Sequence, residues 1–203
     1  MRRNGRAPDV TPGHVSRTPR VAERIAACAA VLRSGGIIAY PTETVYGLGC
    51  LARDRGAVRR IIAIKQRDLG KGLILIGAEL AQLLPYTATL SPTEIEILRS
   101  PRARPTTWVV PTAPGLDPML TGGRSTIAIR LTSHPIAGEL CRLSQSALVS
   151  TSANLSGEAP ARHPDELPPR LARAVDLIVA GACAADAVPS QIIDLLSGAV
   201  LRA

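Results

Sequence analysis

Short apolar runs alternate with helical patterns along most of the chain, and this alternation limits the possible folds more than any other feature. The runs are rich in Ile, Val and Leu and end at Gly, Pro or polar residues, as buried strands do. They cover residues 37–40, 73–76, 106–110, 126–131, 147–150 and 175–179. Apolar spacing and capping residues predict helices over residues 21–33, 54–65, 79–84, 91–99, 134–142 and 165–174. The pattern predicts an α/β domain that ends in a hairpin of residues 189–194 and 200–202.

Composition is compatible with one sizeable domain and excludes a largely disordered chain. The 203 residues are 46% hydrophobic, and Phe is absent, so the core must be built from Leu, Ile, Val and Ala. No apolar run approaches the length of a membrane span, and the N-terminus lacks a signal-peptide apolar core. We therefore expect a cytoplasmic protein with reduced cysteines and no membrane partner.

The chain is strongly basic, with a formal net charge of +8. Such a balance suggests a polyanionic partner, nucleic acid or nucleotide, although a basic composition kept for solubility is the alternative. Residues 1–19 carry several arginines without periodic apolar positions, so we expect a flexible basic arm there and a folded domain over residues 20–203. Binding of nucleic acid by this arm is an alternative to an ordinary tail.

Three polar segments are candidates for a ligand site. Residues 42–46 follow the first strand with four side chains able to hydrogen-bond, although a polar turn between a strand and a helix is the alternative. Residues 65–72 form a glycine-bearing loop with three cations, which suits a triphosphate but also a solvated basic loop. Residues 150–157 are dense in hydroxyl and amide groups, which orient a nucleotide beside cations. Arg130, in a strand, indicates either a held anion or a structural salt bridge.

Together these segments resemble the YrdC/TsaC family. The similar stretches are Ala39–Gly49, Lys65-Gln66-Arg67 with Lys71-Gly72-Leu73, Ser150–Gly157 and Pro189–Leu195. The resemblance runs from about Val21 to Arg202. It implies a single-domain, twisted mixed sheet of the YrdC-like type, with helices packed around a large cationic cavity, in the short branch of the family.

The resemblance also implies an activity, that of a threonylcarbamoyl-AMP synthase. Such enzymes combine L-threonine, bicarbonate and ATP into threonylcarbamoyl-adenylate and pyrophosphate. A downstream threonylcarbamoyl transferase complex then modifies an adenosine next to the anticodon of tRNA. Mg²⁺ is expected on the triphosphate, with no metal site formed by the protein.

The family pattern assigns site residues in this chain. Lys65 and Arg67 are the predicted catalytic residues, because they would hold the phosphates. Thr42 would contact threonine. The other predicted substrate- and ATP-binding residues are Lys71, Thr107, Arg130, Ser150, Ser152, Asn154, Ser190 and Arg202.

Two alternatives and one departure from the family pattern accompany this hypothesis. The alternatives are a non-catalytic module that binds double-stranded RNA or tRNA with the same basic cavity, and a carbamoyltransferase domain of the same fold. The departure is Ala103-Arg104-Pro105, where the family commonly has Pro-Gly-Pro. If the family glycine has a positive φ, Arg104 would be strained. Otherwise the loop has another conformation, with Arg104 pointing into solvent.

Overall fold

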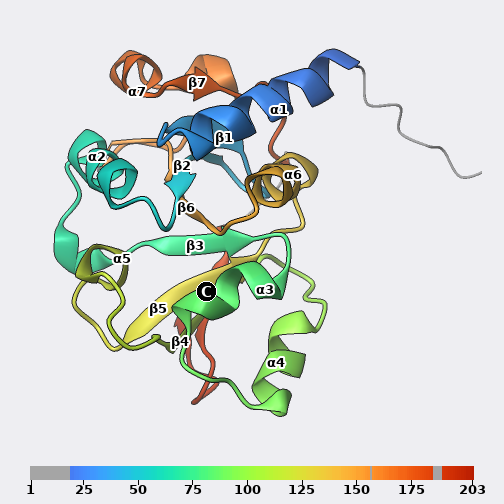
Figure 1. The fold of residues 1–203 in the computed structure, drawn as a ribbon, viewed down its shortest axis with the longest axis vertical. Coiled ribbons are helices and arrows are strands. Elements are labelled where there is room, and N and C mark those ends of the chain that lie inside the picture. The colour runs from blue at the N-terminus through green and yellow to red at the C-terminus, as the bar shows by residue number, and fades with distance from the viewer. Residues whose placement is uncertain (1–18, 156, 185–188) are drawn as a thin grey trace, which may run out of the picture.

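The computed structural model describes residues 19–155, 157–184 and 189–203. Within them, the strands form one mixed sheet in the order β7-β1-β2-β6-β3-β5-β4-β8-β9 (Figure 1). The strands are β1 (Ile38–Pro41), β2 (Tyr46–Leu51), β3 (Ile74–Gly77), β4 (Thr106–Pro111), β5 (Thr126–Leu131), β6 (Leu148–Ser152), β7 (Leu177–Ile178), β8 (Gln191–Asp194) and β9 (Val200–Arg202). Three pairs, β1–β7, β3–β5 and β4–β8, are parallel. The predicted α/β domain is confirmed, including its C-terminal hairpin of β8 and β9.

Helices connect the strands mostly as the sequence predicts, but Pro118–Thr121 forms a short helix in a stretch where the sequence predicts none. They are α1 (Pro19–Arg33), α2 (Arg55–Lys65), α3 (Leu80–Leu83), α4 (Pro92–Arg99), α5 (Pro118–Thr121), α6 (Pro135–Ser144) and α7 (Pro169–Ala174), with 3₁₀ turns η1 (Leu69–Lys71), η2 (Leu84–Tyr86) and η3 (Pro164–Glu166). Prolines divide the predicted helix over residues 165–174 into η3 and α7. Of the predicted arm, residues 1–18 lie outside the described residues, so the boundary of the domain stays a prediction.

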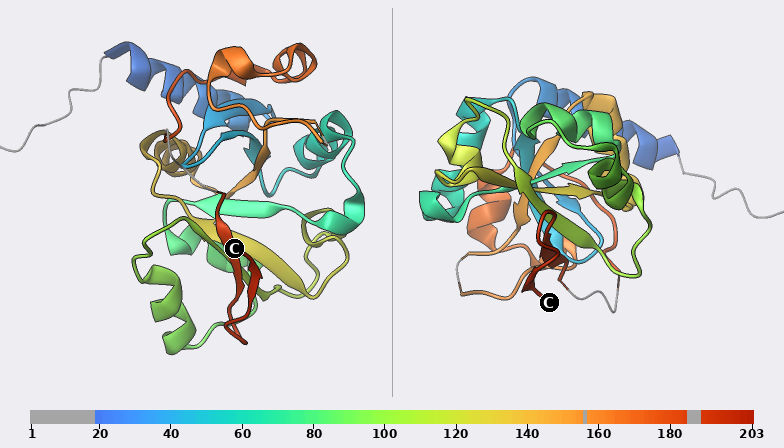
Figure 2. Two further views of the ribbon diagram at one scale, coloured as in Figure 1. Left: turned by 180° about the vertical axis from the view of Figure 1, so that it is seen from behind. Right: turned by 90° about the horizontal axis from the view of Figure 1, so that it is seen from below.

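The helices enclose an aliphatic core. Views from behind and from below show α1, α3 and α6 on one side of the sheet and the C-terminal end on the other (Figure 2). One cluster packs residues of α2, α3 and α4 on the sheet around the buried Trp108, and a second lies between α1, α6 and the sheet. None of the helices in the described residues is long and apolar enough to cross a membrane.

The sequence does not predict β2. A polar turn is correct for residues 42–45 only, because Tyr46–Leu51 forms a strand that pairs antiparallel with β1 and with β6. Glycine has a low strand propensity, so Gly47 and Gly49 remove the sequence signal that would predict this strand. A Cβ at Gly49 would lie 2.6 Å from the Tyr40 ring and 2.8 Å from the Val149 carbonyl oxygen. Tertiary packing therefore requires glycine inside this strand.

Replacing Gly49 by alanine should destabilise the fold by about 1–3 kcal/mol, because the added methyl overpacks the core beside Tyr40. Gly138→Ala is the matched control, since inside α6 a Cβ would meet nothing nearer than the end of the Arg142 side chain, at 3.7 Å. That change should be neutral or stabilise by about 0.5–1 kcal/mol. Urea unfolding of both variants measures the difference, and equal midpoints would contradict the close-approach argument.

Candidate active-site cavity

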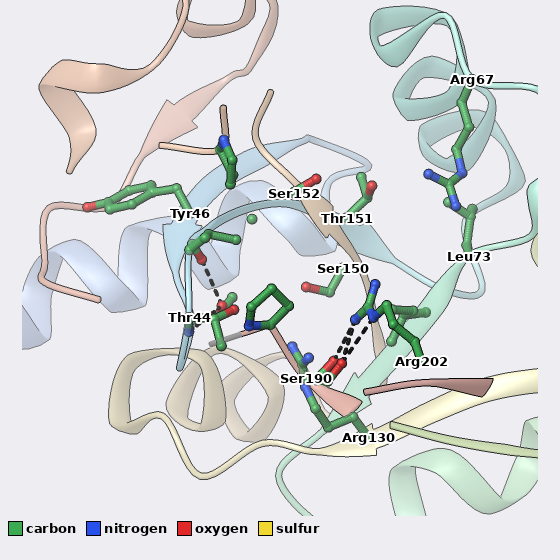
Figure 3. Close-up of a pocket in the computed structure, with 16 residues that line it drawn as sticks. Thr44, Tyr46, Arg67, Leu73, Arg130, Ser150, Thr151, Ser152, Ser190 and Arg202 are labelled. Atoms are coloured by element: carbon green, nitrogen blue, oxygen red, sulfur yellow. Dashed lines mark hydrogen bonds between the residues drawn. The ribbon is translucent and has the colours of Figure 1, made fainter. Parts of the chain in front are cut away.

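A cavity of about 280 Å³ lies over the middle strands of the sheet. The strands β2, β6, β3 and β5 are consecutive neighbours, and each contributes to the lining, while β9 and the residues before β8 close another side (Figure 3). The lining residues are Thr42, Thr44, Val45, Tyr46, Gly47, Arg67, Leu73, Ile74, Arg130, Ser150, Thr151, Ser152, Pro160, Pro189, Ser190 and Arg202. Hydroxyl groups and arginines thus dominate its polar surface.

Three arginines enter the cavity from separate parts of the chain. Arg67 comes from the loop after α2, Arg130 from β5 and Arg202 from β9, and the described lining contains no Asp or Glu. Burial lowers the pKa of Arg202, and the charges of Arg130 and Arg104 lower it further. The cavity therefore concentrates positive charge, and an anionic ligand would relieve the repulsion.

Ser190 anchors the C-terminal side of the cavity. Arg202 donates from Nε and Nη2 to the Ser190 carbonyl oxygen, at 3.2 and 2.6 Å, and from Nη2 to Ser190 Oγ at 3.2 Å. Thr107 Oγ1 lies 3.0 Å from Ser190 Oγ, within hydrogen-bond distance. Thr107 itself is fully buried in β4 and does not line the cavity. Thr107 therefore lies behind Ser190 and positions the Ser190 side chain through this hydrogen bond.

The basic loop divides its cations between different environments. Gln66, the C-cap of α2, has a left-handed backbone with φ of 49°, so the chain turns between Lys65 and Arg67. Arg67 donates from Nε and Nη2 to the Gly72 carbonyl oxygen, at 3.0 and 2.8 Å, and lines the cavity. Lys71 is exposed on η1 and lies outside the described lining.

Lys65 supports the hydroxyl-rich loop from behind. Its ammonium donates to the Ser152 carbonyl oxygen at 2.6 Å, to Asn154 Oδ1 at 3.1 Å and to the Asn154 carbonyl oxygen. These acceptors match the three donors of an ammonium. Ser152 Oγ also donates to Asn154 Oδ1, at 2.6 Å. Burial lowers the pKa of Lys65 to about 8, and the charge of Arg67 contributes to the shift.

The turn between β1 and β2 forms the threonine-rich edge of the cavity. Thr42 Oγ1 donates to the Val45 carbonyl oxygen at 2.7 Å and accepts from the Thr44 backbone N–H at 3.4 Å. The Tyr46 hydroxyl lies 2.9 Å from the carbonyl oxygens of both Val179 and Gly181, and ties β2 to the segment after β7.

The structure brings most of the predicted site residues together. Those in the cavity lining are Thr42, Arg67, Arg130, Ser150, Ser152, Ser190 and Arg202, whereas Lys65, Lys71, Thr107 and Asn154 lie outside it. Among the polar lining residues, the sequence prediction omits Thr151, which lies between two predicted residues, and Thr44 and Tyr46, which lie in the polar stretch after the first strand. The position of Thr44 and Tyr46 beside Thr42 is the signal that would have included these two. The roles of all these residues stay predictions.

Arg104 is not strained. Among the described non-glycine residues only Gln66 and Gln145 have positive φ, so the alternative backbone conformation expected for this loop is correct. The expectation that Arg104 points into solvent is wrong, because Nη2 donates to the Pro189 carbonyl oxygen at 3.1 Å and Nε is buried. Arg104 thereby fixes a residue of the cavity wall.

The part of the chain that the structure describes contains no candidate metal site. No group of three or more His, Cys, Asp or Glu is placed there to hold an ion. The described cavity lining offers hydroxyls and guanidinium groups, and arginine does not ligate Mg²⁺. If Mg²⁺ takes part, phosphate oxygens of a ligand would have to supply most of its bonds.

Sequence comparison identifies the family. The family model named Sua5_yciO_yrdC, described as "Telomere recombination", matches residues 30–203. The chain belongs to this Sua5/YciO/YrdC family. A relative from Stenotrophomonas maltophilia, "Threonylcarbamoyl-AMP synthase", is 48% identical over 85% of this chain and 94% of its own length.

Solved structures of the Sua5/YciO/YrdC family show the same fold. The Sua5 protein of P. abyssi, solved in complex with L-threonine, is 32% identical with a TM-score of 0.77 over 84% of this chain. That match spans 50% of the P. abyssi protein. E. coli YciO is 30% identical with a TM-score of 0.71, over 88% of this chain and 87% of its own. The predicted YrdC-like fold is confirmed.

Proposed function

We propose that this chain is a threonylcarbamoyl-AMP synthase, which makes L-threonylcarbamoyladenylate and pyrophosphate from L-threonine, bicarbonate and ATP. The observation that carries the proposal is the 48% identity to the S. maltophilia threonylcarbamoyl-AMP synthase over 85% of this chain and 94% of that protein. The cationic, hydroxyl-lined cavity supports it, because ATP supplies the anion and threonine the polar groups that such a lining binds.

The chemistry needs positioned charge more than a nucleophilic side chain. The threonine amine first adds to bicarbonate, with loss of water, to give a carbamate. A carbamate oxygen then attacks the α-phosphorus of ATP, the bond to the bridging oxygen breaks, and pyrophosphate leaves. Negative charge grows on the phosphoryl and leaving oxygens, and Arg67, Arg130 and Arg202 stand in the cavity to stabilise it.

The hydroxyl side of the cavity orients the reactants. Ser150, Thr151 and Ser152 lie in a row at the end of β6, and Lys65 holds that end by its bonds to residues 152 and 154. Lys65 then acts through the loop rather than as a direct phosphate ligand. Mg²⁺, when bound by the triphosphate, would neutralise part of its charge.

An RNA-binding module is less well supported than the synthase. Duplex binding needs cations exposed along a surface, whereas Arg67, Arg130 and Arg202 converge in a concave pocket beside hydroxyl groups. We propose that the product passes to a threonylcarbamoyl transferase complex that modifies tRNA, in the cytoplasm.

The decisive experiment incubates the chain with ATP, bicarbonate and single amino acids and follows pyrophosphate release. Release that requires both bicarbonate and L-threonine, with the adenylate detected by mass spectrometry, is the expected result. Release without any amino acid would indicate a simple ATP pyrophosphohydrolase. No release, together with tight binding of duplex RNA, would favour the RNA-binding module.

Thr42→Val tests whether Thr42 contributes to binding of the substrate L-threonine. The change keeps the shape of the side chain but removes the hydroxyl that bonds Val45 and Thr44, so the KM for threonine should rise by about tenfold, while the KM for ATP changes little. Thr87→Val is a matched control, because Thr87 Oγ1 makes a similar bond to the Leu84 carbonyl oxygen and Thr87 is absent from the cavity lining. Equal effects on both substrates would indicate a purely structural role for Thr42.

A further inference from the structure

Glu43 is a buried carboxylate directly behind the cavity wall. It lies in the turn between β1 and β2, flanked by the lining residues Thr42 and Thr44, but does not itself line the cavity. Its side chain is 9% exposed. An isolated buried carboxylate is costly, so its surroundings must compensate the charge.

One carboxylate oxygen organises the start of α6. Oε1 accepts from Thr132 Oγ1 at 2.6 Å, from the Ser133 backbone N–H at 2.8 Å and from the His134 backbone N–H at 3.3 Å. Burial opposes ionisation of Glu43, but the charge of Arg130 and these donors outweigh it, so the pKa lies below its ordinary value. The carboxylate is therefore ionised and held to the end of β5.

The other carboxylate oxygen faces Arg130. Glu43 Oε2 lies 3.6 Å from Arg130 Nη2, and the Arg130 side chain is 8% exposed. This distance exceeds that of a hydrogen bond, so the attraction is Coulombic. Within the described residues, neither Oε2 nor Arg130 Nε has a hydrogen-bond partner.

Within the described residues, the charge of Arg130 is therefore compensated by Glu43 while its Nε donor makes no hydrogen bond. A guanidinium carries five N–H donors, and an anion is the ligand that can satisfy them in a fixed geometry. Burial, and then repulsion from Arg130, lowers the pKa of Arg202. Glu43 is the carboxylate that faces Arg130, the source of that repulsion.

We propose that Glu43 is a positioning residue, which holds the Arg130 guanidinium in the cavity wall and leaves its donors for an anionic group of the substrate. The identity of that group, a phosphate of ATP, rests on the proposed function. Glu43 thus determines how the cavity binds anions although it lies outside the cavity lining. The salt bridge and the held anion, which are the two interpretations of Arg130, are then parts of one arrangement.

A double-mutant cycle tests the proposal by calorimetric binding of ATP and of inorganic pyrophosphate. Glu43→Gln keeps an acceptor for Thr132 but removes the charge that faces Arg130. We expect it to weaken binding of both ligands by about tenfold, within the range of coupling between residues in contact. In an Arg130→Gln background, the same change should alter binding by less than about twofold, because Glu43 then has no guanidinium to hold.

Asp176→Asn is the control variant. Asp176 accepts from the Ile37 backbone N–H and pairs with Arg60, and none of these three residues lines the cavity. Its removal should lower thermal stability without changing binding of ATP or pyrophosphate. Should Glu43→Gln fail to fold, Glu43→Asp takes its place in the same cycle, since it keeps the charge but moves it away from Arg130.

Three results would overturn the proposal. They are an equal loss of binding in both backgrounds, unchanged binding in folded Glu43→Gln, and an unmodified chain that binds neither ligand. Failure of the proposed function looks different. It is the absence of threonine-dependent pyrophosphate release by a chain whose ATP or pyrophosphate binding still shows the coupling.

Discussion

Replacing Arg67 by alanine should slow threonine-dependent pyrophosphate release by about 10²- to 10³-fold, the loss typical of a deleted electrostatic donor. Two of its nitrogens, Nε and Nη2, fix the side chain to the Gly72 carbonyl oxygen. Nη1 makes no hydrogen bond within the described residues, and Arg67 lines the cavity. A guanidinium held in this way is preorganised for phosphate, so its removal should act on the transition state more than on folding.

Two further variants separate the roles of charge, geometry and fold. Arg59→Ala removes an arginine from the exposed face of α2 and should leave the rate within about twofold, as surface substitutions do. Arg67→Lys keeps the charge but loses the fork, so we expect partial activity. Steady-state kinetics and circular dichroism provide the comparison. A folded Arg67→Ala variant with an unchanged rate would remove Arg67 from the site.

Replacing Lys65 by methionine should reduce both activity and stability. The change leaves the Ser152 and Asn154 carbonyl oxygens without the donor that Lys65 supplies, while Asn154 Oδ1 keeps only the Ser152 hydroxyl. We expect the free energy of unfolding to fall by about 1–3 kcal/mol for these unsatisfied acceptors. The loop carrying Ser152 would shift, and a displacement of about 1 Å in a site can cost about 10²-fold in rate.

The effect of Lys65 on stability should depend on pH. Burial, and then the charge of Arg67, lower its folded-state pKa from 10.5 to about 8. Between these two values the unfolded chain binds more protons than the folded chain at this residue, so stability rises with pH. Below about pH 8 the folded chain carries the full cost of the buried charge. The free energy of unfolding of the wild type should therefore increase relative to that of Lys65→Met as the pH rises from 8 to 10.

Urea unfolding of both proteins at pH 7, 8, 9 and 10 measures this difference. Burial raises the pKa of the thiols of Cys28 to about 11 and Cys141 to about 12, which lowers stability at high pH in both proteins equally. Subtracting the two curves cancels these contributions. A difference that stays constant with pH would show that Lys65 titrates at its ordinary pKa, and would contradict the buried ammonium.

Local sequence signals determined the alternating elements and their ends. The Asp54 side chain accepts from the Ala57 backbone N–H at the start of α2, and Ser91 forms a capping box with Glu94 at α4. These contacts join residues three positions apart, so the sequence alone reveals them. Together with the motif segments, they were sufficient to predict the α/β domain, the family and seven residues of the cavity lining.

Contacts between distant segments decided the rest. Whether Gly49 interrupts or permits a strand depends on Tyr40 and on Val149, a residue of another strand. Whether Lys65 reaches the cavity depends on the loop at residues 152–154, and Thr107 acts through Ser190, 83 positions away. Glu43 lies beside Arg130 only because the fold places the turn after β1 next to the end of β5. A sequence shows which side chains carry charge. Only the packed sheet determines which of these side chains pair with each other and which stay available to bind a ligand.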